Sequence, residues 1–226
     1  LSCEIITCGL EHTADYMAKN ITFDEFAHAS FDCVKGDEVL GRFSLSVPGV
    51  HNAANALSAI ALGEKLGLSM EDIQKGLLHF GGTDRRFQYK GKVGGVTIID
   101  DYAHHPTEIA ATLRTAKNYP HRTTWCVFQP HTYTRTKALM HEFAEALTLA
   151  DKVVLADIYA ARETDNLGIS SQNLRDLVAS LGTDAYYFST FDEIEEFLLK
   201  NCIHDDLLIT MGAGDVYKIG ENLLGM

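Results

Sequence analysis

Hydrophobic and polar positions alternate along the first 47 residues in the manner of β-strands. The stretch 3–8 predicts a first strand, and the alternation slips by one position near Phe31. Lys35-Gly36-Asp37 is typical of a turn, and residues 39–47 alternate again. The pattern predicts a small antiparallel meander.

Two helices are expected next, after the break at Pro48-Gly49. The first is rich in alanine, covers about 51–66 and ends at Gly67. Ser69-Met70-Glu71-Asp72 has the serine-x-x-acid spacing of a capping box and predicts a second helix to about residue 80.

The pattern changes after the polar sequence Gly81-Gly82-Thr83-Asp84, which is the expected linker. It divides the chain into domains 1–81 and 82–226. The second domain opens with a hairpin over 87–100 around Gly94-Gly95. Expected strands then alternate with expected helices; the strands are 124–128, 152–156, 185–188 and 206–210, and the helices are 106–117, 136–149, 171–181, 191–200 and 216–224. This alternation predicts an α/β fold with a Rossmann-like, mostly parallel sheet.

Composition narrows the class of protein. The net charge is −12 and no stretch clusters Lys and Arg, which argues against a nucleic-acid partner. The sequence shows no signal peptide and no apolar run long enough for a membrane partner. Five cysteines without CxxC spacing fit reduced thiols in the cytoplasm. Small metabolites or proteins are the expected partners, and the pattern specifies no oligomeric state.

Polar side chains gather where four expected strands end. Because parallel strands end at the same edge of a sheet, these groups are expected to share one site. They are Asp100, Asp101, Tyr102, His104 and His105 after the first strand, His131 and Arg135 after the second, Asp157, Tyr159, Arg162 and Glu163 after the third, and Gly212-Ala213-Gly214-Asp215 after the last.

Several readings stay open for the first of these clusters. Asp101 could bind a ribose, accept a hydrogen bond from an amine, ligate a cation, or cap the helix that Pro106 opens, a cap that Thr107 could equally provide. The His104, His105 pair could bind a metal, but adjacent side chains point apart, so metal binding is the weaker interpretation.

The other candidates also have two readings each. His131 and Arg135 lie four residues apart where a helix begins and could hold a carboxylate, or could belong to a solvated helix start. Gly212-Ala213-Gly214 permits either approach of an anion or close packing. Arg85-Arg86 could reach across an interdomain cleft or face solvent. Asn52 and Asn55 share a helical face, which favours a ligand such as an adenine edge.

These residues lie in sequence strings that resemble the Mur ligase family over essentially the whole chain. The strings are PGVHNAANA at 48–56, residues 82–87, DDYAHHPTE at 100–108, QPHTYTRT at 129–136 and GAGD at 212–215. The HN-x-x-N element is similar to the family in general. The DDYAHHPTE and QPHTYTRT strings resemble the branch that joins L-alanine to UDP-N-acetylmuramate, together with its close murein-recycling relatives.

The resemblance implies a reaction and a role for each candidate. Enzymes of this branch use ATP and Mg²⁺ to phosphorylate the lactyl carboxylate of the sugar nucleotide, and the amine of L-alanine then attacks the acyl phosphate. By resemblance, Asn52 and Asn55 would face adenine, and Arg86 and Asp101 would reach the ribose and phosphates. The implied substrate-binding residues are Tyr102, His104, His131 and Arg135, of which His104, His131 and Arg135 are the implied catalytic residues.

One element of the family pattern is missing from this sequence. No G-x-x-x-x-G-K-[ST] loop, which would cradle a triphosphate, occurs in it. The chain is therefore expected to be a C-terminal part of a longer ligase: residues 1–81 would end the central ATP-binding domain, and 82–226 would form the amino-acid-binding domain. The Mg²⁺ ligands and the uridine-binding domain would lie upstream, and the chain alone is expected to be inactive.

Three alternatives compete with this reading. A ligase of the same family could attach a tripeptide instead of alanine. A metal-dependent hydrolase could use a cluster of Asp101, His104, His105 and His131, and no metal ligand is otherwise assigned. A non-catalytic Rossmann-like binding module is the third.

Overall fold

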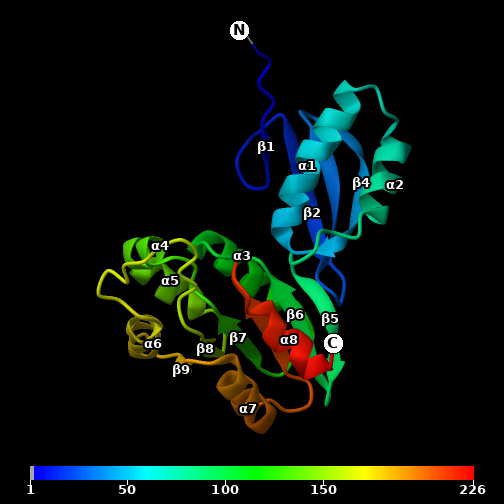
Figure 1. Ribbon diagram of the computed structural model, residues 1–226. Helices are drawn as coiled ribbons and strands as arrows, with labels where there is room; N and C mark the ends of the chain where they lie inside the picture. The colour runs from blue at the N-terminus through cyan, green and yellow to red at the C-terminus, as the bar shows by residue number, and fades with distance from the viewer. Residues whose placement is uncertain (1–2) are drawn as a thin grey trace. The chain divides into compact units, whose positions relative to one another are not determined.

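A computed structural model describes residues 3–226 and divides the chain into two compact units, Leu1–Gly82 and Thr83–Met226 (Figure 1). Each unit has its own hydrophobic core. In the described residues, no helix has both the length and the apolar character needed to cross a membrane.

The described part of the first unit contains a four-stranded sheet and two helices. The sheet order is β1-β2-β3-β4, and α1 and α2 follow in the chain. Alanine, leucine and isoleucine side chains of α1 pack with the sheet to form the core. The elements are β1 (Cys8–Gly9), β2 (Tyr16–Phe23), β3 (His28–Lys35), β4 (Glu38–Pro48), α1 (Val50–Lys65) and α2 (Met70–His79).

The antiparallel meander is confirmed for β2, β3 and β4, and the expected first strand is wrong. β1 covers only Cys8–Gly9 and runs parallel to β2. The chain between them is closed into a loop by Thr7 and Asp15, since the Thr7 amide donates to the Asp15 carboxylate at 2.8 Å and the Asp15 amide donates to Thr7 Oγ1 at 2.9 Å. The loop turns the chain so that β1 meets β2 in parallel orientation.

The second unit is an α/β domain around a six-stranded sheet, as expected. The order is β5-β6-β10-β7-β8-β9, in which only the hairpin strand β5 is antiparallel to its neighbour. The strands are β5 (Gln88–Val93), β6 (Val96–Asp101), β7 (Thr124–Phe128), β8 (Lys152–Leu155), β9 (Asp184–Tyr187) and β10 (Leu207–Met211). The helices are α3 (Pro106–Ala116), α4 (Tyr133–Ala138), α5 (Met140–Leu147), α6 (Ser171–Ser180), α7 (Phe191–Asn201) and α8 (Tyr217–Leu224).

Helices cover both faces of this sheet, which makes three layers (Figure 1). Successive residues of a strand point to opposite faces, so Ile99 packs with α3, α5 and α6, whereas its neighbour Ile98 packs with α7 and α8. Both side chains are fully buried. Burial on both faces explains why the central strands are continuously hydrophobic instead of alternating.

One expected helix is divided in two. The hydrophobic period predicts a single helix over 136–149, but the chain leaves helical geometry at Leu139, where φ is −119° and ψ is 25°. Phe143 and Leu147 beyond the break are fully buried in the core. The apolar spacing continues across the kink, so the pattern alone does not reveal it.

The only tryptophan of the sequence lies in the second unit and is held by a buried carboxylate. Trp125 Nε1 donates to Asp206 at 3.0 Å, and Arg122 and the Ile203 amide donate to the same side chain at 2.8 and 3.0 Å. Both Trp125 and Asp206 are 1% exposed. The fluorescence of Trp125 therefore reports the unfolding of this unit.

Candidate active site

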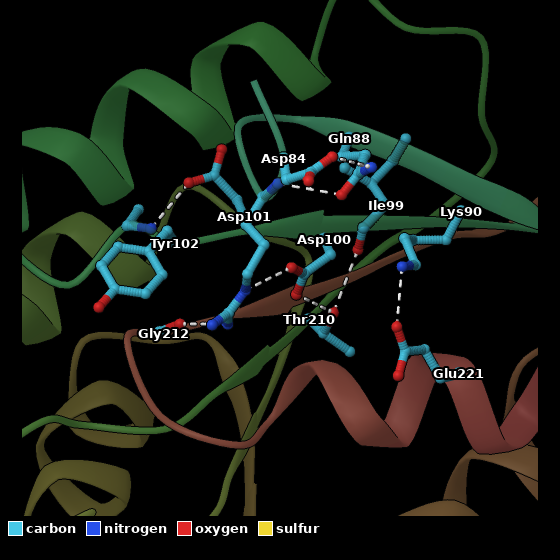
Figure 2. Close-up of polar contacts among 12 residues, drawn as sticks. Asp84, Gln88, Lys90, Ile99, Asp100, Asp101, Tyr102, Thr210, Gly212 and Glu221 are labelled. Atoms are coloured by element: carbon cyan, nitrogen blue, oxygen red, sulfur yellow. Dashed lines mark hydrogen bonds and ion pairs between the residues drawn. The ribbon is translucent and has the colours of Figure 1, made fainter. Parts of the chain in front are cut away.

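An ion pair between the half-buried Arg85 and the buried Asp100 lies at the end of the neighbouring strands β6 and β10. Arg85 donates through Nε to Asp100 at 2.8 Å and through Nη2 to the carbonyl of Gly212 at 2.7 Å. Thr210 donates its hydroxyl to the other Asp100 oxygen at 2.7 Å. In Figure 2, dashed lines join Thr210 to the Asp100 carboxylate and reach the Gly212 carbonyl. The pair ties the start of the unit to the central strands.

Arg85 does not simply face solvent, because its side chain contacts partners within its own unit. Its guanidinium lies between two aromatic rings, 4.8 Å from the centroid of Tyr102 and 4.7 Å from that of Tyr217. With Asp100 only 2% exposed at its side chain, the arginine supplies the charge that a buried carboxylate requires. Arg86 is exposed instead, and Glu108 lies 3.7 Å from it.

Asp101 points into the unit and holds three separate segments. Its carboxylate accepts hydrogen bonds from the amides of Phe87 and Ala103, at 2.9 and 2.8 Å, and from Thr112 Oγ1 at 3.0 Å. Burial raises the pKa of the Asp101 carboxyl, while these donors and Arg86 act in the opposite direction. Asp101 is only 4% exposed, so its hydrogen bonds give it a structural role. Its contact with a nucleotide stays a prediction.

Asp101 and Thr107 are not the caps of the next helix. α3 begins at Pro106, as expected, and its cap is His105, whose Nδ1 accepts from the Thr107 amide at 3.3 Å. His105 is exposed, whereas its neighbour His104 is half-buried, with Nδ1 3.0 Å from the carbonyl of Tyr102. The two imidazoles therefore have different surroundings.

Aromatic and imidazole rings from three strand ends form a continuous series. Tyr102 meets His104 edge to face at 5.4 Å between centroids, and His104 meets His131 in the same manner at 6.2 Å. His131 in turn stacks on Tyr159 at 5.4 Å, with the ring planes 20° apart. The structure thus brings Tyr102, His104 and His131 together at one edge of the sheet, as expected for residues that follow parallel strands.

Three buried polar atoms in the segment that follows β7 have no hydrogen-bond partner among residues 3–226. They are Gln129 Oε1, His131 Nδ1 and Arg135 Nη1. Buried polar groups in proteins are almost always paired, so unpaired groups that share one short segment mark a place where a ligand or ordered water binds. Sequence reasoning gave a role to His131 and Arg135 and none to Gln129, although Gln129 opens the same sequence string.

The turn that presents these groups is held by Thr132 and Glu163. Thr132 has a φ of 68°, which is uncommon for a residue with a side chain, and its Oγ1 accepts from the Arg135 amide at 3.4 Å. Glu163 accepts from the amides of Tyr133 and Thr134 at the start of α4. Glu163 lies in one of the expected polar clusters, but no signal in the sequence pairs it with this helix.

Gly212 and Gly214 serve close packing. A Cβ on Gly212 would lie 2.7 Å from the carbonyl oxygen of Gln129, and one on Gly214 would lie 2.3 Å from Gln129 Oε1. Of the two readings of Gly212-Ala213-Gly214, the structure supports the packing of the last strand end against the β7 loop.

The remaining candidates are Asn52 and Asn55, in the first unit. Asn55 donates to Asn52 Oδ1 at 3.2 Å, and Asn52 donates to the carbonyl of Pro48 at 2.8 Å. Asn52 thus has local partners, while Asn55 is exposed. Their contact with adenine stays a prediction.

A metal centre finds no support in this geometry. Among residues 3–226, no group of three or more His, Cys, Asp or Glu side chains is arranged to hold a metal ion. The cluster of Asp101, His104, His105 and His131 that the hydrolase alternative requires does not form one, because Asp101 is turned inward and His105 caps α3. The hydrolase alternative therefore lacks the ligand set it needs among the described residues.

The pH dependence of stability should contain a contribution from His131. Burial, followed by the charges of Arg135 and His104, lowers the pKa of His131 below 6.5, with Glu163 opposing. As pH falls below about 7, the unfolded chain takes up a proton at His131 before the folded chain does, so stability is lost towards the lowered pKa. We expect urea midpoints, followed by Trp125 fluorescence, to fall less between pH 7 and pH 5 in His131→Gln. Equal slopes in both proteins would contradict the assignment.

Comparisons with known proteins agree with this architecture. A family model described as Mur ligase, glutamate ligase domain, matches residues 85–214. The chain is 58% identical over 221 residues to a UDP-N-acetylmuramate–L-alanine ligase from Agathobacter rectalis, with 98% of this chain and 48% of the relative covered.

Two solved structures are also similar. A UDP-N-acetylmuramate–alanine ligase from Thermotoga maritima has a TM-score of 0.82 and 29% identity, covering 97% of this chain and 47% of that one. A murein peptide ligase from Psychrobacter arcticus has a TM-score of 0.67 and 25% identity, covering 96% and 45%.

The fold and the site define an α/β domain of the Rossmann-like type, with polar groups at the carboxyl ends of its strands. The chain belongs to the Mur ligase family, since the family model matches more than half of it. It spans about half the length of the curated relatives that it matches.

Proposed function

We propose that the whole protein joins L-alanine to the lactyl carboxylate of UDP-N-acetylmuramate at the expense of ATP, in the synthesis of peptidoglycan precursors. In this proposal, residues 1–81 complete the central ATP-binding domain and residues 82–226 form the domain that delivers the amino acid. The observation that carries it is the set of unpaired buried atoms on Gln129, His131 and Arg135. The 58% identity to an alanine ligase supports the choice of amino acid.

The residues after β7 are suited to hold a small amino acid. The guanidinium of Arg135 would bind the carboxylate of L-alanine, because its donors match that geometry and one of them is unpaired. Burial lowers the pKa of His131, which favours the uncharged ring and so limits repulsion of the amine. Tyr102 and His104 would border the lactyl end of the sugar nucleotide. Holding the amine near the acyl phosphate and excluding water would favour amide formation over hydrolysis.

Nucleotide and metal binding are only partly supplied by this chain. Asn52, Asn55, Arg86 and Asp101 are proposed on the ATP side. Among residues 3–226, no group of three or more His, Cys, Asp or Glu side chains suits Mg²⁺, whose chemistry would be to neutralise phosphate charge. The cysteines Cys3, Cys8, Cys33, Cys126 and Cys202 are all free, which suits the cytoplasm, where UDP-N-acetylmuramate and ATP would be met.

The test is phosphate release by the whole protein with ATP, Mg²⁺, UDP-N-acetylmuramate and one acceptor at a time. We expect release that depends on L-alanine. Release only with a tripeptide would instead support the murein-peptide ligase, to which this chain is less similar. Absence of release with L-alanine would contradict the proposal.

The role of Arg135 gives a quantitative prediction. Arg135→Ala should lower kcat/KM for L-alanine on the order of 100-fold, because a hydrogen bond between two charged groups is lost. Arg135→Lys keeps the charge without the paired donors and should recover only part of the loss. Glu142→Ala, an exposed change on α5, is the matched control. Unchanged turnover in both Arg135 variants would favour a non-catalytic binding module.

A further inference from the structure

The orientation of the His131 ring requires an explanation, because its buried Nδ1 has no hydrogen-bond partner among residues 3–226. A histidine in an active site is usually oriented by a hydrogen bond at the ring nitrogen that does not face the substrate. Here the contacts that could orient the ring are aromatic: His104 meets it edge-on at 6.2 Å, and Tyr159 stacks on it at 5.4 Å.

Tyr159 is fixed relative to His131 by the backbone as well as by its ring. The Tyr159 amide donates to the carbonyl of Pro130, and the Thr132 amide donates to the carbonyl of Tyr159, both at 2.8 Å. These two bonds make a parallel bridge that flanks His131 on both sides. The phenol ring is thereby placed beside the imidazole whatever its own hydroxyl contacts.

The absence of a side chain at Gly214 also leaves space for the Tyr159 ring. A Cβ on Gly214 would lie 3.0 Å from Tyr159 Cγ, so the glycine allows Tyr159 to pack against the backbone after β10. Tyr159 as a whole residue is 38% exposed. The stacked pair is therefore supported from the β10 side.

Glu163, four residues further on, orients the other group of the site. Its carboxylate accepts from the amides of Tyr133 and Thr134 and so caps α4, the helix that carries Arg135. The cap also stabilises the turn at Thr132, whose positive φ costs free energy. The segment after β8 thus supplies both the ring that stacks on His131 and the carboxylate that caps the helix of Arg135.

We propose that Tyr159 and Glu163 are positioning residues for the amino-acid site: Tyr159 orients His131 by stacking, and Glu163 orients Arg135 through the cap of α4. This rests on the proposed function, since it assumes that His131 and Arg135 bind L-alanine. Neither residue needs to touch the substrate.

The stacking arm uses Tyr159→Leu and Tyr159→Phe in the whole protein. Tyr159→Leu removes the aromatic face and should raise KM for L-alanine by about tenfold, with KM for ATP changed less than about twofold. Tyr159→Phe keeps the face and should retain the original KM. Trp125 fluorescence verifies that both variants are folded. An unchanged KM in Tyr159→Leu, or a Tyr159→Phe variant as impaired as Tyr159→Leu, would overturn the role of the stack.

The capping arm uses Glu163→Ala and Glu163→Gln. Glutamine keeps an acceptor oxygen for the helix amides, so Glu163→Gln should stay within about threefold of the original KM for L-alanine, whereas Glu163→Ala should raise it by about tenfold. Equal KM values in Glu163→Ala and the unmodified protein would overturn the cap.

A measurement that needs no substrate separates this inference from the proposed function. The imidazole ring protons of His131 should shift in NMR spectra of this chain with Tyr159→Leu and stay within the original range with Tyr159→Phe, because the ring current of the stacked neighbour is lost only in the first. If the whole protein does not use L-alanine, the proposed function fails and this spectrum still decides the stack. Unshifted His131 protons in Tyr159→Leu would overturn it.

Discussion

Replacing Arg85 with alanine is expected to lower the free energy of unfolding of the second unit by about 3 to 5 kcal/mol. The guanidinium is the partner of Asp100, whose side chain is 2% exposed, and its removal leaves the Thr210 hydroxyl as the side-chain donor to that carboxylate among residues 3–226. The carbonyl of Gly212 would lose this donor as well. The cost therefore comes from leaving a buried charge unpaired more than from the loss of a favourable pair.

Urea unfolding followed by Trp125 fluorescence measures this effect, since the only tryptophan lies in the same unit. Arg86→Ala is the matched control: this neighbouring arginine is exposed and 3.7 Å from Glu108, so a change below about 1 kcal/mol is expected. Asp100→Asn combined with Arg85→Ala removes the unpaired charge and should recover part of the stability. A loss for Arg85→Ala no larger than that for Arg86→Ala would refute the account of the ion pair.

Replacing Gly212 with alanine is expected to cost about 3 to 5 kcal/mol in the same measurement, because backbone strain and overpacking add. Its φ of 145° is unfavourable for any residue with a Cβ, and that atom would lie 2.7 Å from the Gln129 carbonyl oxygen. Backbone at the end of a central strand cannot move away as a flexible side chain would. The β10 end should therefore separate from the β7 loop.

Gly182→Ala separates the two contributions. Gly182 also has a positive φ, 95°, but among the described residues, its two chain neighbours aside, no atom lies within 4 Å of the position that an alanine methyl would take there. Its substitution should therefore cost only the strain, about 1 to 2 kcal/mol. If Gly212→Ala and Gly182→Ala lose the same stability, close packing at Gly212 is not the cause.

Hydrophobic patterning was sufficient for the α/β fold of the second unit. The strand Thr124–Phe128 begins and ends where the pattern places it, and α3 starts at Pro106 as expected. Patterning was insufficient where the backbone leaves helical geometry while the hydrophobic spacing continues, as at Leu139. It also missed the loop that makes β1 short and parallel, since that loop depends on side-chain bonds between Thr7 and Asp15.

For the candidate site, the position of a residue along the chain indicated which strand end it follows, but not which way its side chain points. His104, His131 and Arg135 were candidates because they follow strands that a parallel sheet brings to one edge. Arg85 and Asp101 were candidates for ligand contact, yet Arg85 donates to the distant Gly212 and Asp101 accepts from Thr112 on the next helix. No spacing rule reports which way a side chain at a strand end points.

The sequence by itself determined most elements of the second unit, their alternation and the chemical types available at the strand ends, because periodicity and turn residues act over a few neighbouring positions. Only the tertiary structure decided the strand order that sets β10 between β6 and β7, and with it which groups are paired and which remain unpaired. Contacts such as Tyr159 on His131 and Glu163 on α4 join residues about 30 positions apart. Their energies depend on burial and distance, which exist only once the sheet has formed.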